Sequence, residues 1–390
     1  MPAVKKLSFS LRVALLACFS LLAWAAVASC SGFVRVYVGT YTAGESRGIY
    51  RLRLDLTTGA LATDGEPTEA VNPSFLAFSP DGSRLFVVNE TGDSQSAAPG
   101  QVSAFAVDAA TGALTFLNQQ SSGGPAPCHV SVDSQGRHVL VANYWGGSVS
   151  VFPVDADGRL GPATAFVQHE EANAIPGKDA LPHAHSIDLD AANRYAIVAD
   201  LGLDRLFAYR FDATRGTLTA PAGISLPLGA GPRHFTFHPD ARHGYVINEG
   251  NSTLTAFAYE PEAGALRELQ TLSTLPAGFS GRNSTAEIAV SPDGRFLYGS
   301  NRGHDSLAIF AIDAGTGKLT PIGHEPTRGQ HPRHFALDPT GAYLLAANRD
   351  SDSVTVFRIA RTTGKLEPIG APFRIPRPVC LRITGPLARE

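Results

Sequence analysis

The 390-residue chain is rich in glycine and proline, with 39 and 27 residues, and only 17% of it is charged. Such a composition is typical of a β-rich globular protein with many turns. A net charge of −3 without a basic stripe argues against a nucleic-acid partner. Neither a glycine-rich phosphate loop nor a spaced Cys/His pattern occurs, so we expect no cofactor and no metal.

The first 30 residues differ from the rest, because basic residues precede an apolar run over 13–27. This pattern predicts a secretory signal over 1–30, ahead of one domain over 33–385. Residues 27–30, Val-Ala-Ser-Cys, resemble a bacterial lipobox that would place a lipid on Cys30, although a simple cleavage site after Ala28 and an uncleaved anchor are alternatives. We expect an exported protein, periplasmic or a lipoprotein of the cell envelope, that meets the membrane only through that lipid.

The rest of the chain repeats a pattern about every 50 residues. Two strand-like stretches surround a turn rich in Pro, Asp and Gly, and an alternating third strand follows. A Gly two residues before a Leu then precedes a weaker fourth strand. This pair occurs seven times, at Gly59-Leu61, Gly112-Leu114, Gly158-Leu160, Gly216-Leu218, Gly264-Leu266, Gly317-Leu319 and Gly364-Leu366. Seven units of four antiparallel strands predict an all-β, seven-bladed β-propeller.

The two ends of the repeat region predict how the ring closes. Residues Phe33–Thr40 match a second strand that has no first strand before it, and Pro378–Ile383 match a first strand that has no second after it. We therefore expect the C-terminal strand to complete the N-terminal blade, which leaves no open seam. Cys128 and Cys380 fall in first strands of blades that are not neighbours, so we expect two unpaired, buried thiols.

Most second strands end in an asparagine, which gives a reference for alignment. The aligned residues are Thr40, Asn89, Asn143, Ala199, Asn248, Asn301 and Asn348. Fourteen residues earlier lie Phe75, His129, His185, His234, Glu287 and His334, and Cys380 is their counterpart in the C-terminal strand. We interpret the asparagines as structural, because a short amide side chain readily bonds to nearby backbone.

Two further columns of the alignment are expected at the same mouth of the channel. The position before the histidines holds Ser74, Cys128, Ala184, Arg233, Ala286, Arg333 and Val379. The position after the asparagines holds Tyr41, Glu90, Tyr144, Asp200, Glu249, Arg302 and Arg349. A purely structural repeat would keep one residue type in each column, whereas these mix His, Arg and Glu. The mixture favours a ligand site at this mouth.

Several short motifs resemble those of a known family. They are Gly39-Thr40-Tyr41, Ser79-Pro80-Asp81-Gly82, Ala142-Asn143-Tyr144, His183-Ala184-His185, Gly231-Pro232-Arg233-His234 and Asn248-Glu249. With them, the chain resembles the seven-bladed propeller lactonases, which include propeller-type 6-phosphogluconolactonases and fungal 3-carboxy-cis,cis-muconate lactonizing enzymes. The similarity extends from about Val34 to Ile383.

The resemblance implies an active site at the mouth. It implies His185, Arg233 and Glu249 as catalytic residues, and either Arg302 or Arg333 as a further arginine of the site. We also expect the mouth positions His129, His234, Arg302, Arg333 and His334 to bind substrate. One difficulty is that His185 and Arg233 fall in adjacent columns, so in regular strands they would point to opposite sides.

Lactone opening needs a base for water and a donor for the developing oxyanion. A neutral histidine, with an ordinary pKa of about 6.5, can be that base, and we expect His185 in this role. Arg233 would hold a carboxylate or phosphate, and Glu249 would orient Arg233 or His185, or act as acid and base itself. An alternative use of acidic residues at this mouth is a cation held by Glu90, Asp200 and Glu249.

Three functions fit these observations. The first is hydrolysis of an anionic sugar-acid lactone, by resemblance 6-phosphogluconolactone, in carbohydrate metabolism. The second is a lactonizing cycloisomerase that acts on a muconate-type diacid, and the third is a non-catalytic binding propeller of the cell envelope. A phosphorylated lactone is normally cytosolic, so an exported member would favour another lactone. We expect a monomer.

Overall fold

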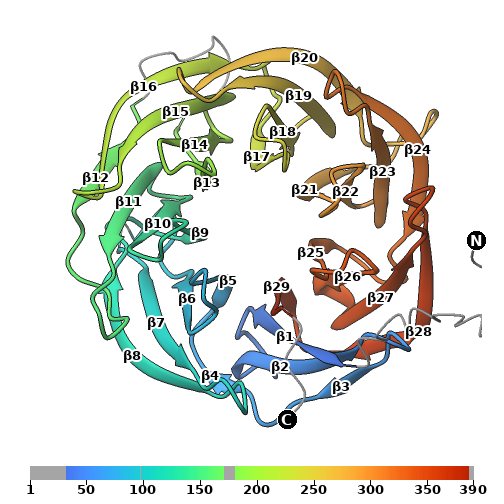
Figure 1. Ribbon diagram of the computed structural model, residues 1–390, viewed down its shortest axis with the longest axis horizontal. Coiled ribbons are helices and arrows are strands. Elements are labelled where there is room, and N and C mark those ends of the chain that lie inside the picture. The colour runs from blue at the N-terminus through green and yellow to red at the C-terminus, as the bar shows by residue number, and fades with distance from the viewer. Residues whose placement is uncertain (1–31, 97, 171–180, 386–390) are drawn as a thin grey trace, which may run out of the picture.

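The computed structural model describes residues 32–96, 98–170 and 181–385. They form seven antiparallel sheets in a ring, and the first strand of each blade lies innermost (Figure 1). This confirms the prediction of an all-β, seven-bladed propeller. The predicted signal over 1–30, Cys30 included, lies outside the described residues. No helix in the described part of the chain is long and apolar enough to cross a membrane.

Each blade is named here by its order in the ring, and its strands run from the channel outward. Blade one comprises β29 (Pro378–Ile383), β1 (Phe33–Thr40), β2 (Gly48–Asp55), β3 (Leu61–Thr63) and β4 (Thr68–Glu69), the last two both paired with β2. Blade two comprises β5 (Pro73–Phe78), β6 (Arg84–Asn89), β7 (Gln101–Val107) and β8 (Leu114–Ser121). Blade three comprises β9 (Pro127–Val132), β10 (His138–Asn143), β11 (Ser148–Pro153) and β12 (Ala165–Gln168).

The remaining four blades have the same order of strands. Blade four comprises β13 (Ala184–Leu189), β14 (Tyr195–Asp200), β15 (Arg205–Asp212) and β16 (Thr217–Ser225). Blade five comprises β17 (Pro232–Phe237), β18 (His243–Asn248), β19 (Thr253–Glu260) and β20 (Ala265–Ser273). Blade six comprises β21 (Ser284–Val290), β22 (Phe296–Arg302), β23 (Ser306–Ile312) and β24 (Leu319–Pro326). Blade seven comprises β25 (Pro332–Leu337), β26 (Tyr343–Asn348), β27 (Ser353–Ile359) and β28 (Leu366–Arg374), with the 3₁₀ turn η1 (Arg349–Ser351) after β26.

The ring closes through the C-terminal strand, as predicted. β29 pairs antiparallel with β1, and Val36 lies opposite Ile383 and Val38 opposite Leu381. Blade one is thereby built from both ends of the chain, and its backbone groups are paired rather than left at an edge. Cys128 and Cys380 are buried free thiols, which confirms that prediction.

The hydrophobic core lies between neighbouring blades, and buried tyrosines fix their spacing. Tyr37, Tyr245 and Tyr298 lie on second strands and are fully buried. Their hydroxyls donate to glycine carbonyls of the next blade, at 2.7, 3.0 and 2.9 Å. Those carbonyls belong to Gly112, Gly317 and Gly364, three of the seven glycines that mark the repeat. All seven have φ between 64° and 84°, in the left-handed region that favours glycine.

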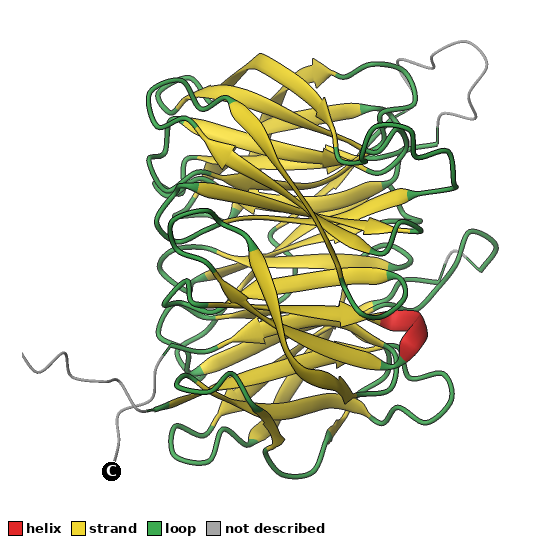
Figure 2. Ribbon diagram, turned by 90° about the vertical axis from the view of Figure 1, so that its right-hand side faces the viewer, coloured by secondary structure: helices red, strands yellow, loops and turns green. Residues whose placement is uncertain are grey.

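A β-bulge interrupts the first strand of every blade near one mouth of the channel. The register shifts around Ser74, Cys128, His185, Arg233, Arg333 and Val379, and across Ala286 and Glu287 in blade six. A bulge leaves one residue unpaired and redirects its side chain. We call this face of the ring the mouth face; η1 lies on it, at the right of Figure 2, whereas the chain leaves the opposite face after β29.

The structure corrects our alignment of blade four by one residue. Its second strand ends at Asp200, which pairs with Ala184 as Asn248 pairs with Pro232. His185 is therefore the counterpart of Arg233 rather than of His234. The Asp200 carboxylate bonds to the loop that enters its blade, where it accepts the backbone N–H of His183 at 2.8 Å. An asparagine such as Asn89 bonds to the corresponding loop in the opposite direction, since its Nδ2 atom donates to the Val71 carbonyl at 2.7 Å. We had expected His185 and Arg233 to point to opposite sides of their strands. This conflict does not arise, because both residues occupy the bulge position of their blades.

Candidate active site

A cavity of about 250 Å³ opens at the mouth face, and we call it the mouth pocket. Its walls come from bulge residues and from residues that follow the second strands. They are Tyr41, Glu90, Cys128, Tyr144, Trp145, His185, Glu249, Arg302 and Arg333. The expected catalytic residues His185 and Glu249 line this pocket, together with both arginines that the sequence left as alternatives.

Glu249 is held by two arginines from neighbouring blades. Its Oε2 atom lies 3.1 Å from Arg233 Nε and 2.7 Å from Arg302 Nη2. Burial alone would raise the pKa of Glu249, but the charges of Arg302 and Arg233 outweigh it and lower the pKa. The carboxylate therefore stays ionised, and the three side chains form one rigid ionic group at the wall of the pocket.

Arg233 lies behind Glu249 rather than in the pocket wall. Its side chain is buried, and its Nη1 atom donates to the Ala286 carbonyl at 2.7 Å and to His234 Nε2 at 3.1 Å. Arg302 likewise donates to the Thr285 carbonyl at 2.6 Å. Both guanidinium groups are thus committed to protein partners, so their geometry is fixed before any ligand arrives.

Arg333 differs, because its guanidinium has no hydrogen bond or ion pair within the described residues. It lies over the ring of Tyr41, with Cζ 5.4 Å from the ring centroid. The Tyr41 hydroxyl donates to Glu90 at 3.0 Å, which engages that carboxylate. Arg333 is therefore the cation of the mouth pocket that has donors free for a ligand.

His185 is the imidazole of the mouth pocket. It is 4% exposed, and its Nδ1 atom lies 3.8 Å from Cys128 Sγ. No group in the described chain bonds to its Nε2 atom. Burial, with the charge of Arg233, lowers the pKa of His185 well below its ordinary value, so the ring is neutral at physiological pH. A neutral imidazole with a free nitrogen at a cavity is suited to accept a proton.

Cys128 touches His185 and was not among the expected site residues. Its thiol lies 3.5 Å from the His185 carbonyl, to which it can donate. Burial raises the pKa of this thiol, so the pair does not present a thiolate nucleophile. Tyr41 and Tyr144 were in an aligned column without an assigned role, and Glu90 was expected only as a ligand of a cation. Trp145, 42% exposed at the pocket, carried no signal in the repeat.

The structure places the other three histidines below the mouth pocket, within the channel. His129, His234 and His334 pack around Phe75, with ring centroids 4.4, 5.5 and 5.5 Å from it. None of the three lines the mouth pocket, because each follows the bulge residue and points away from it. These rings and Glu287 form a layer across the channel, which we call the histidine layer.

A second cavity, of about 370 Å³, lies on the other side of the histidine layer. His129, His234 and Glu287 line it together with Asp188 and Arg382. Burial and the charge of Glu287 raise the pKa of Asp188 to about 7. We call it the channel cavity; it opens toward the face opposite to the mouth pocket.

Comparison with known proteins identifies the family. The sequence matches the family model described as lactonase, 7-bladed β-propeller, over residues 35–383. The chain belongs to this lactonase family. It is 39% identical to the 6-phosphogluconolactonase of Bacillus subtilis over 77% of this chain and 83% of that protein. It is 36% identical to the 6-phosphogluconolactonase of Formosa agariphila over 77% and 85%.

Solved structures support the same relationship. The periplasmic gluconolactonase of Pseudomonas aeruginosa superposes on this lactonase-family protein with a TM-score of 0.85. The two sequences are 34% identical, and the match covers 90% of this chain and 99% of that one. The similarity therefore includes the complete ring of blades rather than a part of it.

Two groups of acidic and histidine side chains in this lactonase-family chain have the chemistry of cation ligands. Glu90, Asp200 and Glu249 are not brought together, because Asp200 is buried, bonds to His169 Nδ1 at 2.6 Å and does not line the mouth pocket. The expectation of a shared cation is therefore wrong. Asp200 is the last residue of its second strand, so Leu201 occupies the position that Glu90 and Glu249 occupy in their blades.

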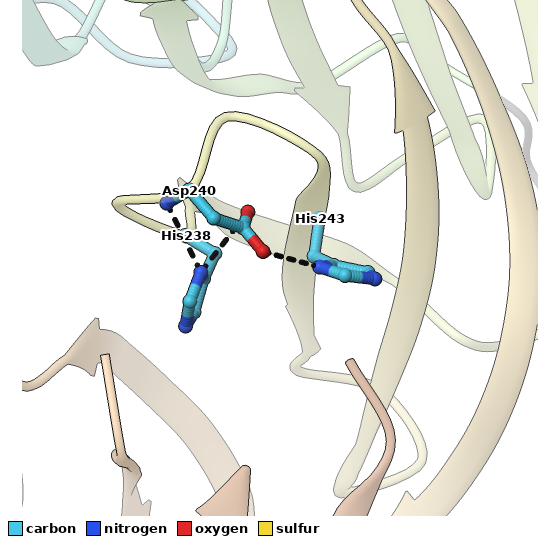
Figure 3. Close-up of side chains that lie close together, drawn as sticks. All are labelled: His238, Asp240 and His243. Carbon is cyan, nitrogen blue, oxygen red and sulfur yellow. Dashed lines mark hydrogen bonds and ion pairs between the residues drawn. The ribbon is translucent and has the colours of Figure 1, made fainter. Parts of the chain in front are cut away.

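The second group is a His-Asp-His cluster on the turn between β17 and β18 (Figure 3). His238 Nδ1 accepts the Asp240 N–H at 3.1 Å, and its Nε2 donates to the Gly294 carbonyl at 2.8 Å. His243 Nδ1 bonds to the Asp240 carboxylate at 2.8 Å. Ser79 and Ser291 occupy the place of His238 in blades two and six, so this cluster stabilises a turn.

Proposed function

We propose that this protein hydrolyses the lactone ring of a sugar acid in the mouth pocket, with His185 as the general base. The observation that carries the proposal is that a neutral, buried imidazole and the guanidinium of Arg333 line the same cavity. Among the described residues, none bonds to His185 Nε2 or to that guanidinium. The names of the Bacillus, Formosa and Pseudomonas relatives support this reaction class.

In the proposed reaction, His185 Nε2 takes a proton from water as the water oxygen bonds to the lactone carbonyl carbon. Arg333 donates hydrogen bonds to the carbonyl oxygen while negative charge develops there. When the ring C–O bond breaks, the imidazolium returns its proton to the leaving oxygen. The products are a new hydroxyl and a carboxylic acid, which ionises in solution.

The charges at the mouth favour an anionic substrate. Three guanidinium groups, those of Arg233, Arg302 and Arg333, face two carboxylates, those of Glu90 and Glu249. The remaining positive charge suits a carboxylate or phosphate on the substrate or product. From the sequence we expected Arg233 to bind this anion. Because Arg233 lies behind Glu249, we propose instead that Arg333 contacts the anion and that Arg233 supports Glu249.

Two lactones remain candidates within this class. The Bacillus and Formosa relatives favour 6-phosphogluconolactone, as the sequence resemblance did. The Pseudomonas relative and the secretory signal favour gluconolactone without the phosphate, because a phosphorylated sugar lactone is normally cytosolic. The two differ by one phosphate group, so the preference of the purified protein decides between them.

A substrate panel tests the proposed function. We expect purified protein to open 6-phosphoglucono-δ-lactone, glucono-δ-lactone or both, at rates well above spontaneous hydrolysis, and to leave a muconolactone and its diacid unchanged. Proton release in weakly buffered solution measures each rate. Turnover of the muconate pair alone would make the protein a cycloisomerase. Binding of lactones without acceleration of their opening would make it a binding propeller.

The proposal of export concerns residues 1–30. It rests on the charged and apolar pattern of that segment and on the periplasmic location given for the Pseudomonas relative. If a lipid is attached to Cys30, the Cys30→Ser variant should move from the membrane fraction to the soluble fraction of the cell. Immunoblots of both fractions measure this. An equal, soluble distribution of both proteins would exclude the lipid and leave simple secretion.

A further inference from the structure

The histidine layer contains a buried carboxylate, that of Glu287, which has no part in the proposed reaction. Glu287 is 7% exposed and lies on β21, in blade six. Its Oε1 atom accepts the Ile288 N–H at 2.9 Å, and its two oxygens lie 3.2 and 3.1 Å from His234 Nδ1. His334 Nε2 approaches the same carboxylate at 3.0 Å. Glu287 thus connects blades five, six and seven beneath the mouth.

The hydrogen bonds fix which nitrogen of His234 carries the proton. The Nδ1 atom faces a carboxylate, which accepts hydrogen bonds, so Nδ1 carries the hydrogen. The Nε2 atom faces Arg233 Nη1 at 3.1 Å, and a guanidinium has donors only, so Nε2 presents its lone pair. Only the neutral Nδ1–H tautomer satisfies both contacts.

This arrangement connects the histidine layer to the wall of the mouth pocket. Arg233 receives its orientation from two hydrogen-bond acceptors, His234 Nε2 and the Ala286 carbonyl, and from its ion pair with Glu249. Of these partners, only His234 can lose its ability to accept a hydrogen bond from Arg233 by a change of tautomer. Removal of the carboxylate at position 287 would allow the proton to move to Nε2, where it would oppose the N–H of Arg233.

We infer that Glu287 is a positioning residue: it fixes the Nδ1–H tautomer of His234, whose Nε2 atom then holds Arg233 against Glu249 at the mouth pocket. The inference rests on the proposed function for its catalytic consequence. It does not require that Glu287 touch substrate, because this carboxylate lines the channel cavity and does not line the mouth pocket.

The kinetic test compares two carboxylate-to-amide substitutions in the same channel. Glu287→Gln should lower kcat/KM for the preferred lactone by about 10- to 100-fold, as expected when a supporting contact shifts a site by about 1 Å. Asp188→Asn is the matched control: it lines the channel cavity but has no contact with His234 or Arg233 in the described chain, and should change kcat/KM by less than about 3-fold.

A double variant separates positioning from a general loss of stability. If Glu287 acts through His234, then Glu287→Gln added to His234→Gln should reduce kcat/KM no further than His234→Gln alone. The inference would be overturned if the loss of kcat/KM in the double variant equalled the product of the losses in the two single variants. Wild-type kinetics in Glu287→Gln would overturn it as well. Melting temperatures of the three variants show whether each one remains folded.

Nuclear magnetic resonance tests the tautomer without any substrate. Long-range ¹H–¹⁵N spectra of the wild-type protein, with the His234 signals assigned through His234→Gln, should show a neutral ring with its proton on Nδ1. In Glu287→Gln the signals should shift toward the Nε2–H form. A proton on Nε2 of His234 in the wild type would refute the inference, even if Glu287→Gln does not fold. If the protein opens no lactone, the proposed function fails while this measurement still decides the tautomer.

Discussion

Replacing His185 by alanine is expected to lower kcat for the preferred lactone by about 10²- to 10⁴-fold, the usual contribution of a general base. The expectation follows from its position, since the His185 imidazole lines the mouth pocket and no described residue bonds to its Nε2 atom. The change removes the proton acceptor but leaves Arg333 and the Arg233–Glu249–Arg302 group in place. KM should therefore change much less than kcat in steady-state measurements.

The pH dependence of the wild-type protein tests the same assignment. A base works only when it is unprotonated, and burial with the charge of Arg233 lowers the pKa of His185 below its ordinary value of about 6.5. The acidic limb of kcat/KM should consequently lie below pH 6.5, and the rate should stay level as the pH falls through that value. His238→Ala, on the opposite face, is the control and should keep this profile. Near-normal turnover and an unchanged acidic limb in His185→Ala would place the base elsewhere.

Deletion of the chain after Arg377 is expected to destabilise the whole ring. It removes β29, in which Val379, Cys380 and Leu381 are at most 2% exposed, and leaves an unpaired edge on β1. Burial of a single valine or leucine side chain contributes about 1.5–3 kcal/mol, and a domain is stable by only about 5–15 kcal/mol. We expect aggregation, or a loss on the order of 5 kcal/mol in denaturant unfolding.

The matched control for this deletion removes residues 386–390 alone and leaves β29 in place. It should unfold at nearly the same denaturant concentration as the full chain. If the protein truncated after Arg377 remained soluble and unfolded cooperatively with similar stability, blade one would not need its C-terminal strand, and our account of ring closure would be contradicted.

The number of blades and their closure could be predicted because local chemistry encodes them. Each blade repeats a glycine with positive φ, and only a few residue types tolerate that conformation, so Gly112 or Gly317 is visible in the sequence alone. The missing first strand before Phe33 and the extra strand from Pro378 to Ile383 are equally visible. These features depend on the chain itself rather than on contacts between distant blades.

Our alignment of blade four was wrong because an aspartate, Asp200, stands where most blades have an asparagine. Without an asparagine at the end of its second strand, we aligned His185 with His234 because both are histidines. The structure aligns it with Arg233, since Asp200 takes the place of Asn248. Both kinds of side chain bond to the backbone of the loop that enters the blade, Asp200 as an acceptor and an asparagine such as Asn89 as a donor, so the replacement preserves the fold while it hides the register.

The composition of the site could be predicted in part. His185, Glu249, Arg302 and Arg333 meet in one pocket, as the columns indicated. The separation of the bulge residues from the histidines that follow them was not predictable, because it depends on a local change of strand pairing. For the same reason, the sequence did not indicate that Arg233 would be enclosed by Glu249, Ala286 and His234 while Arg333 stays free.

We propose above all that the lactone ring binds in the mouth pocket, between His185 and Arg333. A crystal structure with the aldonate product, or with a lactam that resists hydrolysis, tests it most directly. We predict a carboxylate or carbonyl oxygen within hydrogen-bond distance of Arg333 and the ring carbon near His185 Nε2, beside Trp145. A ligand in the channel cavity, next to Asp188 and Arg382, would contradict the account.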